Sequence, residues 1–418
     1  MNLILIFLIE ILFLKKFNFI TIKLKKSQNQ NVKFRNLQSL SPIYGNTHKI
    51  HYYYTNLFIT KNKINQTYIL DTGSTITTSP CSLCKKCGNH LNNPYPINKE
   101  NILKCNNDKC KMVKSNCLKD ENCSFNIFYN EGSSLNGLFI NEMIYFSDKL
   151  NEKNNIYSIP IGCTINESFI FENQLVDGIL GLDNSEKNFV SVLKKNNIIK
   201  KNIFTLCFTE EGGYFSIGEI NNQLHNSNQI SYTKFKDGEH YFIKITNIKI
   251  ENETIDINKN AFIDSGTTLT FIPKKFSEKI INKIIEICNK EDNIKNKKCG
   301  NYVKNPNYGH CFTFNNYNEI FMAINNTFPI IIFNINNELN YFWNPKYYFI
   351  NISEYINYTI CLGISNKGNK FLLGSTWMKG YDIIFDRDNF LLGFVPSDCI
   401  KKLEIVKYIL LFFFFFFY

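Results

Sequence analysis

Short apolar runs separated by polar turns recur from about residue 41 almost to Cys399. The first three are rich in aromatic and β-branched residues and cover 51–54, 57–60 and 68–70, with a hairpin turn expected at 62–65. Helical periodicity is limited to Val190–Lys200 and to Lys274–Asn289, which starts after Pro273. Many strands with few helices predict an all-β fold.

Two of these runs lead into the same four-residue pattern. Tyr68–Leu70 precedes Asp71-Thr72-Gly73-Ser74, and Ala261–Ile263 precedes Asp264-Ser265-Gly266-Thr267. In each copy, glycine allows two such loops to approach closely, and the hydroxyl residues can hydrogen-bond the carboxylate. One copy alone is common in turns, but two copies after apolar strands indicate a shared carboxylate pair.

The residues that follow each copy indicate an internal duplication. Val176–Leu182 and Phe371–Thr376 are apolar, glycine-containing strands, and each follows its Asp loop at nearly the same distance. Between the strand-like runs Phe125–Ile127 and Gly137–Ile140, residues 128–133 are predicted to form the tip of a long β-hairpin. The alternative for this tip is an ordinary turn without a special role.

Fourteen cysteines are too many for an ordinary cytosolic enzyme. Half of them gather in one insert: Cys81, Cys84, Cys87, Cys105, Cys110, Cys117 and Cys123. The spacing of the first three, with His90 nearby, would suit zinc, whereas a disulfide-stapled loop suits an oxidising compartment. We favour disulfides. The other expected partners are Cys163 with the insert, Cys288 with Cys299, Cys311 with Cys361, and Cys207 with Cys399.

The ends of the chain and its charge bear on compartment and partners. Residues 1–22 are typical of a signal peptide and 23–43 of a leader or short pro-segment. The apolar tail at 405–418 is shorter than the roughly 20 residues of a spanning helix, so we expect a thin or truncated membrane anchor rather than a buried helix. The formal charge of +11 comes from scattered lysines without a compact basic stripe, which argues against nucleic-acid binding.

These motifs, in this order, resemble the pepsin-type aspartic proteases over roughly residues 44–400. The resemblance implies a bilobal all-β fold with few helices. The N-terminal lobe would be 44–208, including the cysteine-rich insert (81–123) and a flap (125–140), and the C-terminal lobe 209–400. Asp71 and Asp264 would be the catalytic dyad, and Tyr129 the flap tyrosine that closes over a polypeptide substrate. The residues that would support the dyad are Thr72, Gly73, Ser74, Ser265, Gly266 and Thr267. No metal or cofactor is required, and a monomer is expected.

Within that family, the insert, a flap glutamate and the apolar tail resemble the membrane-anchored processing proteases of the endoplasmic reticulum in malaria parasites. This implies lumenal lobes and secretory substrates with an Arg-x-Leu export signal. Glu131 would pair with the substrate arginine, Gln174 would be a second contact, and Gly132 belongs to the flap. Ile76–Pro80 stands where digestive members carry a tryptophan. The alternatives are a less selective degradative or maturase protease, and a non-catalytic binding protein, which the two intact Asp loops disfavour.

Overall fold

The computed structural model describes residues 39–47, 51–113, 116–117, 121–129, 132–146, 157–227, 229–236, 238–290, 299–353, 358–367 and 369–399. The signal-like segment, most of the leader, the apolar tail and the flap residue Glu131 lie outside these ranges. Among the described residues, no helix is both long enough and apolar enough to cross a membrane.

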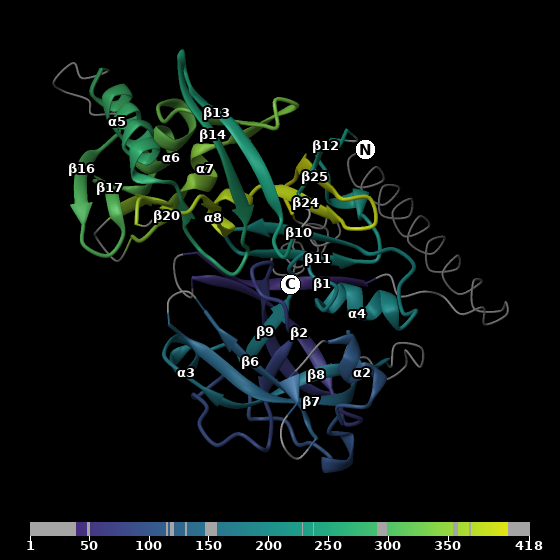
Figure 1. Ribbon diagram of the computed structural model, residues 1–418. Coiled ribbons are helices and arrows are strands. Elements are labelled where there is room, and N and C mark those ends of the chain that lie inside the picture. The colour runs from purple at the N-terminus through teal and green to yellow at the C-terminus, as the bar shows by residue number, and fades with distance from the viewer. Residues whose placement is uncertain are drawn as a thin grey trace, which may run out of the picture. The chain divides into compact units, whose positions relative to one another are not determined.

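The N-terminal half of the chain forms a run of neighbouring strands from β1 to β9 (Figure 1). Its strands are β1 (Ser39–Asn46), β2 (Tyr52–Ile59), β3 (Ile64–Asp71), β4 (Thr78–Pro80), β5 (Asn116–Cys117), β6 (Cys123–Phe128), β7 (Ser134–Tyr145), β8 (Tyr157–Glu167) and β9 (Gly178–Gly181). Its helices are a 3₁₀ turn at Lys99–Asn101, α2 (Asp108–Met112), α3 (Ile170–Asn173) and α4 (Phe189–Lys195). β6 and β7 pair as the two arms of the expected hairpin.

A second group of strands, in the order β12-β25-β24-β10-β11-β1, joins segments from both halves of the sequence. They are β10 (Ile203–Thr209), β11 (Gly212–Ile217), β12 (Ser231–Lys234), β24 (Tyr381–Asp386) and β25 (Leu391–Pro396), with a 3₁₀ turn at Asn222–Leu224. Because β10 pairs with β24, the last strand of the N-terminal half is hydrogen-bonded to a strand from the C-terminal half.

The C-terminal half contains two further sheets and the longest helix among the described residues. The strands are β13 (Phe242–Ile250), β14 (Glu253–Ile263), β15 (Thr270–Phe271), β16 (Asn301–Asn305), β17 (Gly309–Phe314), β18 (Ile331–Ile335), β19 (Leu339–Trp343), β20 (Phe349–Asn351), β21 (Tyr358–Leu362), β22 (Ile364–Ser365) and β23 (Leu372–Leu373). The helices are α5 (Lys274–Lys290), α6 (Tyr317–Asn326), α7 (Pro345–Tyr348) and α8 (Ser375–Met378).

The expected internal duplication is present in the strand pairing. β3 runs parallel to β9, with Asp71 opposite Gly181, and β14 runs parallel to β23, with Ile263 opposite Leu373. β4 lies between β9 and β8, antiparallel to the first and parallel to the second. β15 makes the same two kinds of pairing with β23 and β22. The sequence therefore predicted both the all-β class and the repeat correctly.

Two local predictions were wrong. The runs at 51–54 and 57–60 belong to one strand, β2, whose side chains alternate between buried and partly exposed, and the turn falls at Thr60–Lys63 rather than at 62–65. Thr60 and Lys63 both adopt positive φ angles (68° and 53°), which are uncommon for these residue types and cannot be predicted from them. The helix expected at Val190–Lys200 ends at Lys195, because Asn197 adopts φ 56° and turns the chain.

All fourteen cysteines form disulfides, so the zinc interpretation of the insert is wrong. The pairs are Cys81 with Cys163, Cys84 with Cys87, Cys105 with Cys117, Cys110 with Cys123, Cys207 with Cys399, Cys288 with Cys299, and Cys311 with Cys361. The pairings expected from the sequence are confirmed. No thiolate remains to coordinate a metal ion.

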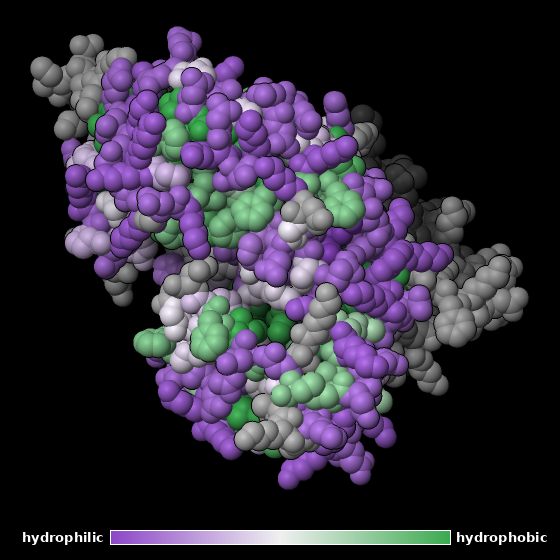
Figure 2. Space-filling model, viewed as in Figure 1, coloured by the Kyte–Doolittle hydropathy of each residue, from purple (hydrophilic) through white to green (hydrophobic). Residues whose placement is uncertain are grey.

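The surface in Figure 2 is largely hydrophilic, as expected for a lysine- and asparagine-rich chain. Hydrophobic side chains gather on this face around a hollow near its centre. A hollow lined by apolar side chains is a common feature of ligand-binding surfaces.

Candidate active site

The two Asp loops lie at the ends of equivalent strands. Asp71 is the last residue of β3, and its carbonyl accepts a hydrogen bond from the Leu182 amide at 2.8 Å. Asp264 follows β14, and its amide donates to the Leu373 carbonyl at 3.0 Å. The parallel neighbours β9 and β23 therefore fix the backbone of each aspartate.

Reciprocal hydrogen bonds join the two loops. The Thr72 amide donates to Ser265 Oγ at 3.0 Å, and the Ser265 amide donates to Thr72 Oγ1 at 2.9 Å. Each hydroxyl also donates across to the other strand, from Thr72 to the Ile263 carbonyl at 2.9 Å and from Ser265 to the Leu70 carbonyl at 2.7 Å. All four bonds are buried, so the distance between the loops is tightly set.

Each carboxylate is oriented by its own loop. The Gly73 amide donates to Asp71 Oδ1 at 2.8 Å, and the Ser74 hydroxyl donates to Asp71 Oδ2. In the second loop, the Gly266 amide donates to Asp264 Oδ1 at 3.1 Å. These bonds leave the two Oδ1 atoms on the side where the loops meet.

Glycine is needed where the loops meet. A Cβ atom on Gly73 would lie 2.8 Å from Asp264 Oδ1, and one on Gly266 would lie 2.5 Å from Asp71 Cγ. Thr267 completes the second loop by donating to Asp264 Oδ2 at 2.7 Å. Both loops thus use glycine to admit the carboxylate of the other.

The two carboxyl groups lie close enough to influence each other's ionisation. Burial, followed by the negative charge of Asp264, raises the pKa of Asp71 to about 7, although the bond from Ser74 opposes this. Burial also raises the pKa of Asp264, and the bond from Thr267 opposes it. Near neutral pH the pair can therefore hold one protonated and one ionised carboxyl.

Tyr129, the expected flap tyrosine, contacts this pair through Ser74. The Tyr129 hydroxyl lies 3.1 Å from Ser74 Oγ. Because the single Ser74 hydroxyl proton goes to Asp71, Tyr129 is the donor in this contact. In the segment 76–80 that follows the first loop, Thr78 Oγ1 lies 2.6 Å from Thr164 Oγ1.

Of the other residues expected to contact the substrate, the structure describes Gly132 and Gln174. Gly132 closes the tip with φ 98°, and its amide donates to the Tyr129 carbonyl at 3.0 Å. Glu131 lies outside the described residues. Gln174 is buried at the end of α3, and its side-chain amide donates to the Val176 carbonyl at 3.0 Å. On α3, the ring of Phe171 packs edge-on against Tyr129 with centroids 5.0 Å apart.

The segment behind the first loop contains residues that the sequence did not single out. Asp183 is fully buried, its amide donates to the Ser74 carbonyl, and its Oδ2 accepts from Thr75 Oγ1 at 2.6 Å. Burial raises its pKa, and bonds from Ser185 and Thr75 oppose this. No sequence signal marked Asp183, because its partner is more than a hundred residues away.

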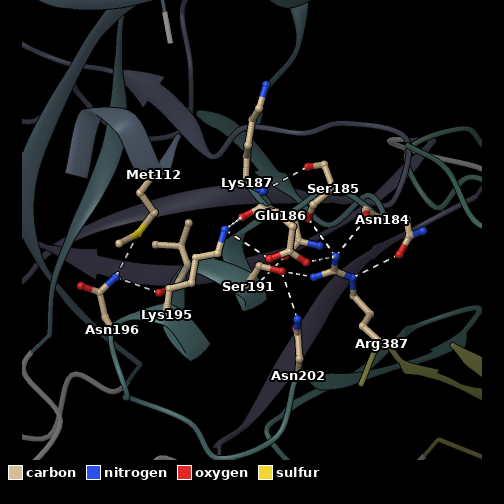
Figure 3. Close-up of polar contacts among 12 residues, drawn as sticks. Met112, Asn184, Ser185, Glu186, Lys187, Ser191, Lys195, Asn196, Asn202 and Arg387 are labelled. Atoms are coloured by element: carbon tan, nitrogen blue, oxygen red, sulfur yellow. Dashed lines mark hydrogen bonds and ion pairs between the residues drawn. The ribbon is translucent and has the colours of Figure 1, made fainter. Parts of the chain in front are cut away.

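Figure 3 shows how a buried arginine holds the next residues of that segment. The Arg387 guanidinium donates to the Asn184 carbonyl at 2.9 Å, to the Ser185 carbonyl at 3.0 Å and to Ser191 Oγ on α4. It lies 3.3 Å from Glu186 Oε1. The C-terminal strands thereby anchor the chain that supports the Asp71 loop.

The fold and the two paired Asp loops are those expected of an aspartic protease, and a comparison with known protein families agrees. The family model for eukaryotic aspartyl proteases matches residues 52–397, so the chain belongs to that family. It is an aspartic endopeptidase, whose substrates are polypeptides.

Several relatives are similar over most of this chain. Plasmepsin V of Plasmodium falciparum is 24% identical over 439 residues, covering 85% of this chain and 72% of the relative. Aspartic proteinase 36 of Arabidopsis thaliana is 22% identical, covering 84% and 75%. Aspartic protease 5 of Toxoplasma gondii is 18% identical, covering 85% of this chain and 37% of its own length.

Proposed function

We propose that Asp71 and Asp264 are the catalytic dyad of this endopeptidase. The observation that carries the proposal is the pair of carboxyls held between two reciprocally bonded loops. The ionised carboxyl takes a proton from a water molecule held between the pair, and the water attacks the peptide carbonyl. The protonated carboxyl polarises that carbonyl and then gives its proton to the leaving amine. Thr72, Ser265, Gly73 and Gly266 set the geometry of this step.

We further propose that the enzyme is a processing protease that cuts Arg-x-Leu-type export signals of secretory proteins. Similarity to plasmepsin V supports this. In this proposal Gln174, whose side-chain nitrogen is held by the Val176 carbonyl, offers its Oε1 to the substrate arginine. Glu131, at the flap tip, supplies the opposite charge in this proposal.

We propose the lumen of the endoplasmic reticulum as the compartment, with the tail at 405–418 as membrane anchor and the protein as a monomer. Seven disulfides support an oxidising compartment. Carbonate extraction of membranes from cells that express the chain with and without residues 405–418 tests the anchor. Release of the full-length protein into the soluble fraction would refute it.

A peptide assay tests activity and selectivity together. The full-length protein is given peptides that contain Arg-x-Leu, Lys-x-Leu or Ala-x-Leu in the same flanking sequence. We expect cleavage after Leu in the first peptide only, and no turnover by Asp71→Asn or Asp264→Asn variants that retain the wild-type melting temperature. Turnover by either variant would refute the dyad.

The same assay distinguishes this selective enzyme from the alternative, a less selective degradative or maturase protease. For a selective enzyme, Glu131→Ala removes the preference for arginine. If all three peptides are cut equally and Glu131→Ala changes nothing, the enzyme is a less selective protease on the same dyad.

A further inference from the structure

A histidine in the cysteine-rich insert bridges both ends of the segment that carries α3. The side chain of His90 is 2% exposed. Its Nε2 lies 2.9 Å from Glu167 Oε2 at the end of β8, and its Nδ1 lies 3.0 Å from the Gln174 carbonyl at the end of α3. Residues 168–173, which include α3, therefore form a segment whose two ends are both held by one imidazole ring.

The two contacts require an extra proton. The Gln174 carbonyl can only accept a hydrogen bond, and Glu167 Oε2 already accepts one from the Gly88 amide at 2.9 Å. Both bonds to His90 form only if the ring carries two N–H groups, or if Glu167 holds the second proton. Deprotonation of this pair breaks one bond inside a buried site.

The charges around the ring favour the protonated state. Burial lowers the pKa of His90, but the bond to Glu167 and the charge of that carboxylate outweigh it, so the pKa lies above its ordinary value. The Asp177 carboxylate adds to this, and it is itself bonded by Asn92.

The other titratable groups near the segment are already engaged. Lys86 pairs with Glu172 on α3 at 2.7 Å. The Tyr52 hydroxyl accepts from the Leu175 amide at 3.1 Å. In the part of the chain that the structure describes, neither group is hydrogen-bonded to the His90 ring.

The bridged segment forms the wall that the flap meets. Phe171 lies at its centre, is buried, and packs against Tyr129, whose hydroxyl bonds Ser74 beside Asp71. We propose that His90 is a positioning residue: its protonated ring clamps residues 168–174 against the flap, and loss of the proton loosens this wall and weakens substrate binding. The proposal rests on the endopeptidase activity and not on the Arg-x-Leu preference.

Steady-state kinetics between pH 5 and 8.5 test this with three proteins. His90→Gln keeps a donor that can reach Glu167, cannot bond the Gln174 carbonyl at the same time, and does not titrate. His225→Gln is the matched control, because the His225 side chain is equally buried and bonds Asp382 at 2.9 Å on β24, which seven strands separate from β8 in the sheet order. The substrate is the best peptide found for the wild-type protein, whatever its sequence.

We expect KM of the wild type to rise about three- to tenfold as the pH passes above the ordinary histidine value of 6.5, since about one hydrogen bond is lost. His90→Gln should have the raised KM throughout this range without the pH step. His225→Gln should follow the wild type. The pH dependence of kcat, which reports the dyad, should be common to all three. A KM step of the same size in His90→Gln would overturn the proposal.

Hydrogen–deuterium exchange gives a measure that needs no substrate. After correction for intrinsic exchange, amides of residues 168–175 should exchange faster above the His90 pKa in the wild type and in His225→Gln, and at all pH values in His90→Gln. Equal protection in the wild type at both ends of the pH range would overturn the clamp. That result leaves the proposed cleavage specificity to be judged by the peptide assay alone.

Discussion

At the scale of single residues, small side chains decide how the dyad works. Ser74 donates its single hydroxyl proton to Asp71, so its oxygen accepts the hydrogen bond from the Tyr129 hydroxyl of the flap. This makes Ser74 a link between flap position and the ionisation of Asp71. Its bond stabilises the ionised carboxylate and therefore holds the pKa of Asp71 below the value that burial alone would give.

Ser74→Ala should lower kcat/KM about 10- to 100-fold, because a hydrogen bond to a charged group contributes about 1.5–3 kcal/mol. It should also raise the pKa of Asp71, so that this carboxyl stays protonated to higher pH. The alkaline limb of the pH–rate profile, which we expect near pH 7 in the wild type, should then move to higher pH. Ser79→Ala is the control, because Ser79 bonds the buried Tyr68 hydroxyl at 2.8 Å and does not contact the dyad. An unmoved alkaline limb in Ser74→Ala would contradict the assignment.

Gly266→Ala should reduce kcat/KM by about 100-fold or more, because its Cβ would overlap the Asp71 carboxyl and push the loops apart. The added methyl lies at the loop contact and not in a core, so the disulfides should still form. Activity and thermal unfolding measured on the same preparation distinguish displacement of the dyad from failure to fold. Wild-type turnover would show that the loops do not need this approach.

At the scale of elements, the insert between β4 and β6 depends on covalent links. Among its described residues, the elements are the five-residue helix α2, a short 3₁₀ turn and the two-residue strand β5. Of its disulfides, Cys81 with Cys163 spans 82 residues, whereas Cys84 with Cys87 spans three. A cross-link that closes a longer loop removes more entropy from the unfolded chain.

The paired change Cys81→Ala with Cys163→Ala should therefore lower the free energy of unfolding by about 4 kcal/mol, and Cys84→Ala with Cys87→Ala by less than about 2 kcal/mol. Urea unfolding followed by circular dichroism gives both values. Equal losses would mean that strain or packing, and not loop closure, governs the insert.

At the scale of the whole molecule, the N- and C-terminal halves are tied together by the β10–β24 pairing and by Arg387. Arg387 lies just beyond β24 and is buried, while three of its acceptors lie on the chain between β9 and α4 or on α4 itself. Removing the guanidinium leaves these acceptors without their partner in a largely buried site.

Arg387→Ala should lower the free energy of unfolding by about 3 kcal/mol, since buried acceptors of a charged donor lose their partner. Lys195→Ala is the control from the same network. Lys195 pairs with Glu186 at 3.2 Å, but the two side chains are 35% and 64% exposed, so the loss should stay below about 1 kcal/mol. Thermal or urea unfolding of both variants provides the comparison. Similar losses would assign the effect to surface charge.

The sequence by itself determined what depends on local pattern and on repeats. The strand followed by Asp, hydroxyl residue, Gly and hydroxyl residue specifies each loop, and its second occurrence specifies the pair. The number of cysteines, an even fourteen, allowed a disulfide framework to be expected. Helix α6 was not predicted, although the sequence contains a local signal for its start. Asn316 caps this helix by accepting a hydrogen bond from the Glu319 amide, three residues on.

Only the tertiary structure decided the contacts that join distant segments. His90 meets Glu167 and Gln174, and Arg387 meets Asn184, across 77 to 203 residues of chain. Such side chains look like ordinary polar residues in the sequence, because their partners are set by where the strands cross and not by neighbours along the chain. Each Asp loop could be predicted because its residues are adjacent in the sequence. The groups that position the loops and the flap wall could not, because their partners are distant in the sequence.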